Sequence, residues 1–325
     1  MNEKTFCILP YIHHHIDVKG TPGLCCIADG GNEKLSEFGN AEYVKIRKLM
    51  AEGTRLKECH RCWTAEAQNR ISHRQKHNNK WRHIIPELYN KQILSVDYRF
   101  SNHCNFACAY CTDGESSKWG VLLGKTNPVT QSAIDIDTAN LKYVYLAGGE
   151  PLLIPAFRNF CKSIKHKDKT ELVINTNLSR IDDEWISIIS EFNVKCLNVS
   201  VDSYGELGAY MRWPMDWNKF AANVAKVKNN NIPIMFNTLM CNINYLDLDA
   251  LLDWMHPFDP VAIMMYECVD PKHFNLDLLK KHYSTLFVKA TQKFLEHPLT
   301  QQHEYMQNFL QSQLDNIYAY DKDVQ

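Results

Sequence analysis

Three cysteines in the stretch SNHCNFACAYCTDGESSKWG, residues 101–120, have a spacing that suits a metal centre. Cys104, Cys108 and Cys111 form a C-x3-C-x2-C pattern, and thiolates at such spacings ligate zinc or an iron–sulfur cluster. Most cysteine sites use four protein ligands, whereas a cubane cluster held by three leaves one iron without a protein ligand. The trio therefore predicts either a distant fourth ligand or a centre that is open to a small chelating molecule.

A second group of residues that could bind a ligand follows the run YVYLAG at Gly148-Gly149-Glu150. Two glycines allow a backbone to approach a ligand closely. Glu150 and the neighbouring carbonyls can accept hydrogen bonds from an ammonium group, and Pro151 suits the start of the next helix. The segment could also be a plain turn, but its place one βα unit after the cysteine loop favours a binding role.

Four more cysteines are grouped near the N-terminus: Cys7, Cys25, Cys59 and Cys62. The first two fit C-x12-G-x4-C with Gly20 as the glycine, and the last two form C-x2-C. Cys26 adjoins Cys25 and is an alternative ligand. A four-cysteine set suits either a second cluster or a structural zinc site.

The composition is that of an ordinary globular protein, with 45% hydrophobic and 22% charged residues among 325. The net charge of -1 favours no charged partner, so we expect no nucleic acid. No apolar run is long enough for a membrane span, and the N-terminus lacks the pattern of a signal peptide. We therefore expect a cytoplasmic protein without disulfides, in which seven of the twelve cysteines fall into spaced groups that suit metal or cluster binding.

From residue 92 onward, short runs rich in β-branched and aromatic residues alternate with amphipathic helical segments. The predicted strands are 93–100, 143–148, 171–177, 196–202, 233–239 and 261–267, and the helices between them include 154–167, 182–192, 217–230 and 248–255. This alternation predicts an α/β fold with a parallel sheet or barrel. Six repeats are too few for a complete eight-stranded barrel, so we expect a partial (βα)6 barrel of the TIM type. A doubly wound sheet is the alternative, although no G-x-G-x-x-G follows the first strand.

The cysteine trio, with the aromatic Tyr110 before its last member, resembles the signature of the radical S-adenosylmethionine (SAM) enzymes. Gly148-Gly149-Glu150 resembles that superfamily's motif for the methionine amino group, and residues 92–268 resemble its partial barrel. The resemblance implies that the trio ligates a [4Fe-4S] cluster. It also implies that the amino and carboxylate groups of SAM occupy the open iron.

Further cofactor contacts are implied at the ends of later strands. Ser200 is the first candidate there and Asp202 the second, while Arg212 could pair with the SAM carboxylate or form a structural salt bridge. Three asparagines could face a ligand or cap helices: Asn175, Asn177 and Asn237. Ser116 and Ser117 are possible polar contacts in the loop after the trio.

The N-terminal cysteines resemble the twitch module, a relative of the SPASM domain that carries an auxiliary [4Fe-4S] cluster. The stretch HHHIDVKGTPGLCC predicts its β-hairpin, with Gly20 to Gly23 at the turn. His13, His14 and His15 could tune the cluster. We expect an auxiliary module over 1–65, a basic helical linker over 66–91, the barrel over 92–270 and a helical extension over 271–325. The basic composition of this linker indicates a helix face exposed to solvent, or a surface that binds an acidic partner.

The resemblance implies that an external reductant of the flavodoxin or ferredoxin type supplies one electron. SAM is then cleaved to methionine and a 5′-deoxyadenosyl radical, which abstracts a hydrogen from the substrate. A peptide or protein is the expected substrate, with oxidation, cross-linking or epimerisation as the result. For epimerisation, Cys241 and Cys268 are candidates to return a hydrogen atom to the substrate radical. The alternative is that they are buried thiols without a chemical role, like Cys161 and Cys196. The alternatives are a small carbohydrate- or nucleotide-derived substrate, or a protein that only binds SAM or carries electrons.

Overall fold

A computed structural model describes residues 3–30, 33–35, 37–68, 70–84, 92–125, 136–193 and 196–323. Its sheet has the strand order β2-β1-β3-β4-β5-β6-β7-β8. Strands β3 to β8 follow one another in chain order, so the order does not reverse anywhere within this run of βα units. This excludes the doubly wound alternative and confirms the predicted α/β partial barrel.

The chain divides into two compact units. Unit 1 comprises Met1–His103, Asn127–Val173 and Glu191–Asn193, and unit 2 comprises Cys104–Thr126, Ile174–Ser190 and Val194–Gln325. The strands of unit 1 are β1 (His13–Ile16), β2 (Pro22–Gly23), β3 (Ser95–Tyr98), β4 (Tyr143–Leu146) and the start of β5 (Glu171–Thr176). Its helices are α1 (Leu9–Ile12), α2 (Ala41–Ala51), α3 (His60–Ala67), α4 (His73–Lys80) and α6 (Pro155–Ser163), with 3-10 turns η1 (Glu33–Leu35), η2 (Lys57–Cys59), η4 (Pro151–Leu153) and η5 (Lys167–Lys169).

The predicted N-terminal hairpin is present, but its turn lies earlier than expected, because Gly23 belongs to β2 and the turn closes between Asp17 and Thr21. β1 pairs antiparallel with β2, and the Asp17 carboxylate accepts hydrogen bonds from the backbone N–H groups of Lys19 and Thr21 at the turn. Gly20 has a φ of 86°, a conformation that glycine adopts without strain. The sequence did not reveal that β1 also pairs in parallel with β3, which makes the hairpin part of the main sheet.

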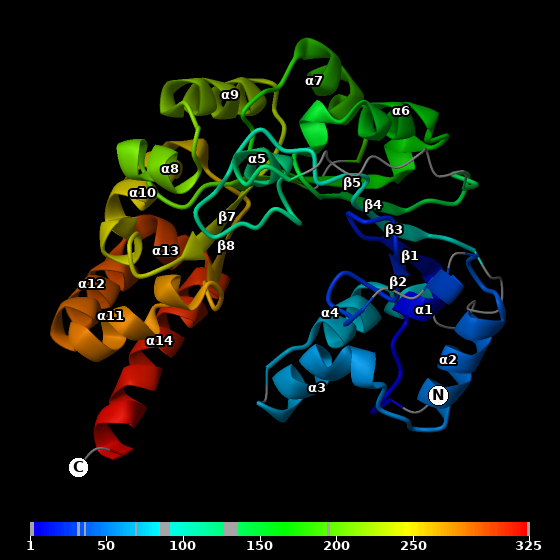
Figure 1. The fold of residues 1–325 in the computed structure, drawn as a ribbon, viewed down its shortest axis with the longest axis horizontal. Coiled ribbons are helices and arrows are strands. Elements are labelled where there is room, and N and C mark those ends of the chain that lie inside the picture. Colours follow the sequence, from blue (N-terminus) through cyan, green and yellow to red (C-terminus); the bar gives the residue numbers. More distant parts are fainter. Residues whose placement is uncertain are drawn as a thin grey trace. The chain divides into compact units, whose positions relative to one another are not determined.

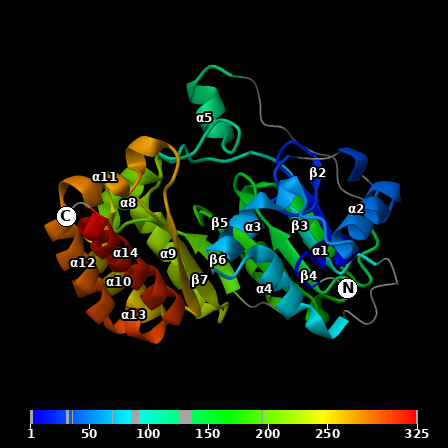
Figure 2. The same ribbon diagram turned by 90° about the horizontal axis from the view of Figure 1, so that it is seen from below.

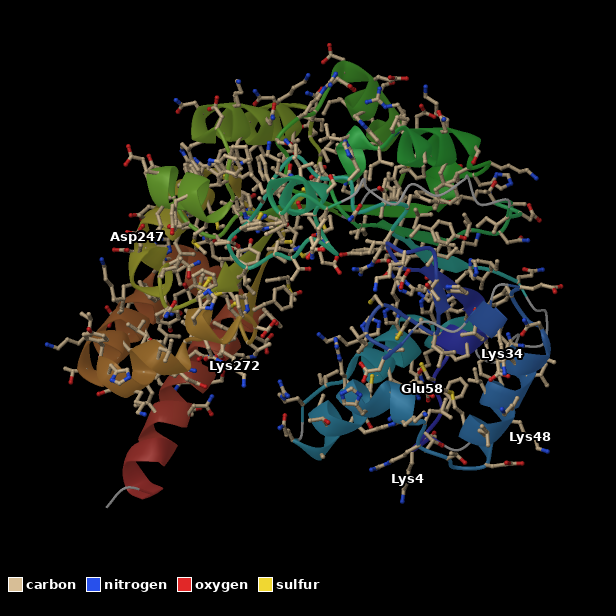
Figure 3. The ribbon with its side chains drawn as sticks, viewed as in Figure 1. Lys4, Lys34, Lys48, Glu58, Asp247 and Lys272 are labelled. Carbon is tan, nitrogen blue, oxygen red and sulfur yellow. The ribbon has the colours of Figure 1, made fainter. Side chains whose placement is uncertain are left out.

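The helices of unit 1 pack through apolar stripes. In α2, Tyr43, Ile46 and Met50 are buried, while Lys48 lies on the solvent side of the helix (Figure 3). Asn40 caps this helix by accepting hydrogen bonds from the N–H groups of residues 42 and 43. Within the predicted basic linker, α4 is not uniformly solvated, because Arg74 is buried.

Unit 2 continues the βα repeat. Its strands are the end of β5, β6 (Cys196–Ser200), β7 (Ile234–Met240) and β8 (Ala262–Glu267). Its helices before β8 are α5 (Ser117–Leu122), α7 (Asp183–Ser190), α8 (Gly205–Met211), α9 (Trp217–Asn229) and α10 (Leu248–Met255), with turns η6 (Tyr245–Asp247) and η7 (His256–Phe258). Along β7 the burial alternates, so that Phe236 and Thr238 are buried while Asn237 is half-buried on the other face.

The C-terminal region is helical, as predicted. It consists of η8 (Lys272–Phe274), α11 (Asp277–His282), α12 (Ser284–Glu296), α13 (Pro298–Gln302) and α14 (Glu304–Asp323). Figures 1 and 2 show these helices gathered beside α10, and α14 contacts β8. Tyr245 stacks on Phe287 at 4.3 Å between ring centroids, and its hydroxyl hydrogen-bonds Thr291. Among the described residues, no helix has the length and apolarity needed to cross a membrane.

Candidate functional site

The loop that carries the cysteine trio is ordered by its own hydrogen bonds. Cys104 Sγ accepts from Phe106 N at 3.4 Å, and Cys111 N donates to the Cys108 carbonyl at 3.0 Å. Ser117, at the start of α5, accepts from Cys104 N at 3.1 Å. The three thiols thus belong to one compact turn, with Cys108 buried and the other two partly exposed.

Neighbouring segments of unit 2 hold this loop from the outside. Ala107 N donates to the Trp213 carbonyl at 2.6 Å, and Ala109 N donates to the Met211 carbonyl at 2.8 Å. Trp119 Nε1 donates to the Cys108 carbonyl at 2.9 Å. Sequence reasoning missed Trp119, because no pattern relates a helical tryptophan to a carbonyl eleven residues earlier. The sequence suggested Ser116 and Ser117 as ligand contacts. In the structure, both hydroxyls donate hydrogen bonds to backbone carbonyls of the cysteine loop.

Three residues predicted to bind the cofactor contact one another. Arg212 Nε lies 2.8 Å from Asp202 Oδ2, and Arg212 Nη2 donates to Asp202 Oδ1 at 3.1 Å. The Tyr110 hydroxyl donates to Asp202 Oδ2, and Leu239 N donates to Oδ1 at 2.9 Å. The Asp202 side chain is fully buried, so its carboxylate links the cysteine loop to α8 and β7. This geometry corresponds to the salt-bridge alternative for Arg212.

An amide network lies beside Cys104. Asn177 Nδ2 lies 3.8 Å from Cys104 Sγ and donates to Asn105 Oδ1 at 3.1 Å, while Asn105 Nδ2 donates to Ser179 Oγ at 3.0 Å. Asn177 Oδ1 also accepts from Ser179 N at 2.9 Å. Asn177 thus shapes the turn before α7 and approaches a thiol, but it does not cap that helix, at whose start the Asp182 carboxylate accepts from Trp185 N. Hydrogen bonds to cluster sulfurs are one of the factors that set reduction potentials.

The other predicted polar residues at strand ends lie together on β5, β6 and β7. Asn237 Nδ2 donates to Asn175 Oδ1 at 2.9 Å, and Ser200 is the register neighbour of Asn237 on the adjacent strand. All three side chains are half-buried. They form a polar patch on the sheet face whose other residues include Met235 and Leu239 of β7.

In unit 1 the glycine pair packs tightly against the segment that leads into the cysteine loop. Gly149 N donates to the Ser101 carbonyl at 2.8 Å, and Glu150 N donates to the His103 carbonyl at 2.7 Å. A Cβ on Gly149 would lie 2.1 Å from the His103 carbonyl oxygen, and Gly148 has a φ of 115°. Any side chain at Gly149 would therefore displace the residue that immediately precedes Cys104. The Glu150 carboxylate is buried and accepts from Leu152 N at 3.0 Å.

The N-terminal cysteines converge from separate elements. One pocket of unit 1 is lined by all four predicted ligands: Cys7, Cys25, Cys59 and Cys62. His73 and Arg74 also line it, and neither was foreseen. Cys26 is not among the lining residues, and its thiol lies within hydrogen-bonding reach of the Asp97 side chain.

The triple histidine faces β3. His13 Nδ1 lies 2.8 Å from Ser95 Oγ, and His15 Nδ1 lies 3.6 Å from Asp97 Oδ1. His14 Nδ1 is 3.0 Å from the Tyr98 hydroxyl. None of the three lines the pocket of four cysteines, and among its described lining residues the histidine is His73.

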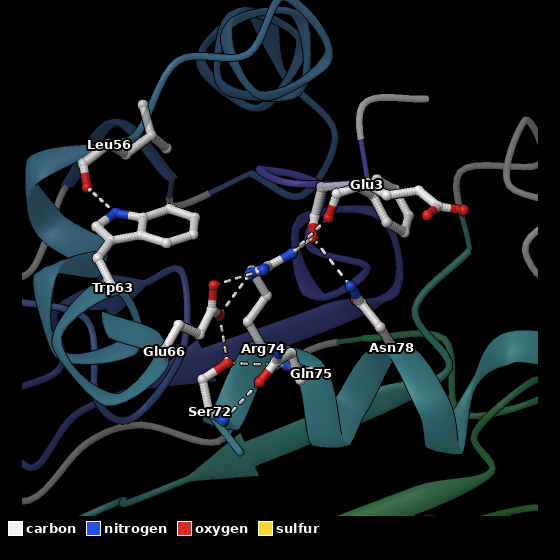
Figure 4. Close-up of polar contacts among 9 residues, drawn as sticks. Glu3, Leu56, Trp63, Glu66, Ser72, Arg74, Gln75 and Asn78 are labelled. Atoms are coloured by element: carbon white, nitrogen blue, oxygen red, sulfur yellow. Dashed lines mark hydrogen bonds and ion pairs between the residues drawn. The ribbon is translucent and has the colours of Figure 1, made fainter. Parts of the chain in front are cut away.

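A buried ion pair holds the helices around this pocket (Figure 4). Arg74 of α4 donates to both Glu66 oxygens, from Nε at 3.0 Å and Nη2 at 2.8 Å. Its Nη1 donates to the carbonyls of Phe6 and Glu3 at 2.6 and 3.1 Å. The guanidinium thereby joins α3, which carries Cys62, to the segment that carries Cys7.

The thiols are held in low-polarity surroundings. Burial raises the pKa of Cys108 to about 12, and it raises the pKa of Cys25 to about 11 and of Cys59 to about 12, with mutual thiolate repulsion adding to the effect. Such thiols stay protonated at neutral pH, so metal binding must supply the energy of deprotonation. Four thiols around one pocket and three in one loop are donor sets that fit iron–sulfur clusters.

No described group of three or more His, Cys, Asp or Glu side chains has the geometry of a site for a single metal ion. The two hydrogen-donor candidates, Cys241 and Cys268, are fully buried beside Met211 and near Tyr110. Each of these thiols faces the other at the ends of β7 and β8. Burial raises the pKa of Cys268, and it raises that of Cys241 further.

Comparison with known proteins adds a family. Residues 98–255 match the family model of the Radical SAM superfamily. A GTP 3′,8-cyclase of Clostridium perfringens (strain SM101 / Type A) is 23% identical over 225 residues, which cover 62% of this chain and 67% of that protein. An S-adenosylmethionine-dependent nucleotide dehydratase of Psychrobacter lutiphocae is 25% identical over 236 residues, covering 66% of this chain and 77% of that protein.

Solved structures are also similar. Native anSMEcpe with bound AdoMet has a TM-score of 0.46 and 17% identity, with 62% of this chain and 61% of that chain covered. SuiB of Streptococcus suis bound to S-adenosylmethionine has a TM-score of 0.43 and 14% identity, with 78% of this chain and 57% of that chain covered. This chain therefore spans less than two thirds of either solved chain.

Proposed function

Because residues 98–255 make this chain a member of the radical SAM superfamily of enzymes, we propose that it cleaves SAM reductively at the loop of Cys104, Cys108 and Cys111. The observation that carries the proposal is the compact turn that holds exactly three thiols, with Asn177 and Tyr110 placed around it. A [4Fe-4S] cluster bound there supplies the electron that converts SAM to methionine and a 5′-deoxyadenosyl radical, which takes a hydrogen from the substrate.

The chain's own residues serve this reaction in three ways. The backbone of Gly148 to Glu150 offers carbonyls near the segment that enters the cysteine loop, and these suit the SAM ammonium group. The polar patch of Asn175, Ser200 and Asn237 suits the ribose hydroxyls. Asp202 and Arg212 act as positioning residues, because their buried pair fixes Tyr110 beside Cys111.

The second part of the proposal is an auxiliary [4Fe-4S] cluster on Cys7, Cys25, Cys59 and Cys62. Its support is that four thiols from four different segments line one pocket. A cluster with four cysteine ligands has no open iron for a substrate, so we expect it to transfer electrons or to stabilise the fold. An external flavodoxin- or ferredoxin-type donor and a reducing, cytoplasmic setting suit two clusters and twelve free cysteines.

For the substrate we propose a nucleotide or nucleotide-derived molecule. Its support is the activity for which the curated relatives are named, since they are GTP cyclases and a nucleotide dehydratase. A peptide or protein is the second candidate.

Anaerobic reconstitution with iron, sulfide, dithionite and SAM tests the chemistry. We expect 5′-deoxyadenosine from the native chain and from a Cys161→Ala control, and none above background from Cys104→Ala. Equal yields from the native and Cys104→Ala proteins would contradict the proposal. For the substrate, GTP, ATP and mixed peptides are added in parallel. A stimulated yield with nucleotides alone supports the first candidate, and stimulation by peptides alone refutes it.

A further inference from the structure

Unit 1 contains a pocket that none of the chemistry above uses. Its volume is about 440 Å³, within the range of small-molecule sites. We define it as the amino-edge pocket, with Tyr11, Lys80, His83, Lys142, Lys169 and Glu171 among its lining residues. All of them belong to unit 1.

The floor of the pocket is a rigid backbone ladder at the amino ends of the strands. Leu94 N donates to the Ile12 carbonyl at 2.9 Å, Lys142 N donates to the Leu94 carbonyl at 2.9 Å, and Glu171 N donates to the Lys142 carbonyl at 2.9 Å. These residues lie just before or at the start of β1, β3, β4 and β5. The chain enters the cysteine loop after the other end of β3, so the pocket is separate from the proposed SAM site.

The described residues that line the pocket include three lysines and one carboxylate, that of Glu171. Lys80 is neutralised, because its Nζ lies 3.0 Å from Glu171 Oε2 and 3.7 Å from the centroid of the Tyr143 ring. Lys142 and Lys169 are exposed, and within the described residues neither has a carboxylate within ion-pair distance. Two unpaired lysines beside a pocket favour a ligand with at least two negative charges, such as a phosphate.

The rest of the wall suits a planar ring. Tyr11, His83 and Ile84 provide aromatic and apolar surface, and aromatic faces stack readily on heterocycles. The side-chain amides of Gln92 and Asn140 supply both donors and acceptors, which could pair with the edge of a base.

We propose that the amino-edge pocket is a second binding site, distinct from the SAM site, for a nucleoside phosphate. The lysines at positions 142 and 169 bind the phosphate groups, and the wall of Tyr11 and His83 holds the base. The proposal stands on the pocket alone and does not depend on the substrate proposed above.

Binding of ATP and GTP to the full chain saturated with SAM tests the site. Bound SAM keeps nucleotide out of its own place, and the lysine substitutions separate this pocket from a substrate site beside SAM. We expect the Lys142→Gln/Lys169→Gln double variant to bind at least tenfold more weakly, while the exposed Lys228→Gln control binds like the native chain. The native affinity should fall as salt rises. Both lysines are exposed, so the double variant should keep its fold and its SAM cleavage.

Further probes separate the alternatives. Cys104→Ala should still bind nucleotide, which keeps this test independent of the proposed radical chemistry. Adenosine and tripolyphosphate should each bind more weakly than ATP. The proposal is overturned if the double variant binds nucleotide as tightly as the native chain, or if SAM displaces the nucleotide. Tripolyphosphate or a glutamate-rich peptide binding as tightly as ATP would also overturn it.

Discussion

Asp202 shows how one residue's role depends on its neighbours. Its carboxylate accepts hydrogen bonds from Tyr110, Arg212 and Leu239 N, all within unit 2. A residue so engaged organises the cysteine loop rather than presenting a free carboxylate to a ligand. A buried pair is costly to break, because removal of one partner leaves the other charge without compensation.

The Asp202–Arg212 pair gives the prediction at this scale. Arg212→Met should lower the free energy of unfolding of the apo protein by about 3–5 kcal/mol, as should Asp202→Asn. The double variant should lose clearly less than the sum of the two, because neither charge is then left alone. Urea unfolding without SAM measures this, with the exposed Arg180→Met as control. Two outcomes would assign Arg212 to the cofactor instead. One is that the losses in unfolding free energy are additive, and the other is that Arg212→Met is fully stable and fails only in SAM binding.

At the scale of elements, α4 depends on a side-chain clamp more than on an apolar face of its own. In α4 the only buried residue is Arg74, and this helix begins with a capping box formed by Ser72 and Gln75. The Arg74 guanidinium reaches the Glu66 carboxylate, two backbone carbonyls and the Trp63 ring, whose centroid is 5.1 Å away. One side chain therefore fixes the two helices that border the four-cysteine pocket (Figure 4).

Replacement of this clamp should loosen the pocket. Lysine keeps the charge of Arg74 but cannot bind both Glu66 oxygens and the carbonyls at once. Arg74→Lys should therefore cost about 2–3 kcal/mol of unfolding free energy and speed amide exchange in α3 and α4. Arg82→Lys, at an exposed position, should change neither. Equal exchange rates in both variants would show that the clamp is dispensable.

For the whole molecule, the two thiol sets differ in how the chain builds them. The trio comes from one turn of eight residues. The N-terminal set gathers residues from four places: the segment before α1, the segment after β2, η2 and α3. A local set depends on one loop, and a dispersed set depends on the folding of the surrounding unit.

Metal content tests the proposed pair of clusters. The reconstituted native chain should hold about eight irons, the content of two cubanes. Cys25→Ala should fall to about four, and Cys26→Ala should stay near eight, because Cys26 faces Asp97 rather than the pocket. A Cys25→Ala/Cys26→Ala double variant shows whether Cys26 substitutes. About four irons with one zinc in the native chain would refute the auxiliary cluster.

Much of the architecture could be predicted from local pattern. Alternating runs from residue 93 to 267 marked the six strands β3 to β8, because strand and helix periodicities are set by near neighbours in the chain. The trio, the glycine pair and the N-terminal hairpin were visible for the same reason, since each is a short continuous segment with its own chemistry.

The tertiary structure decided what depends on residues far apart. Only it pairs β1 with β3, joins Asp202 to Tyr110 and Arg212, selects Cys25 over Cys26 for the pocket, and assembles the amino-edge pocket from Tyr11, Lys142 and Lys169. Such contacts link positions up to about 160 residues apart, where periodicity carries no information. Sequence by itself determined which chemistry the thiols can do, and the packing of the chain determined which side chains surround them.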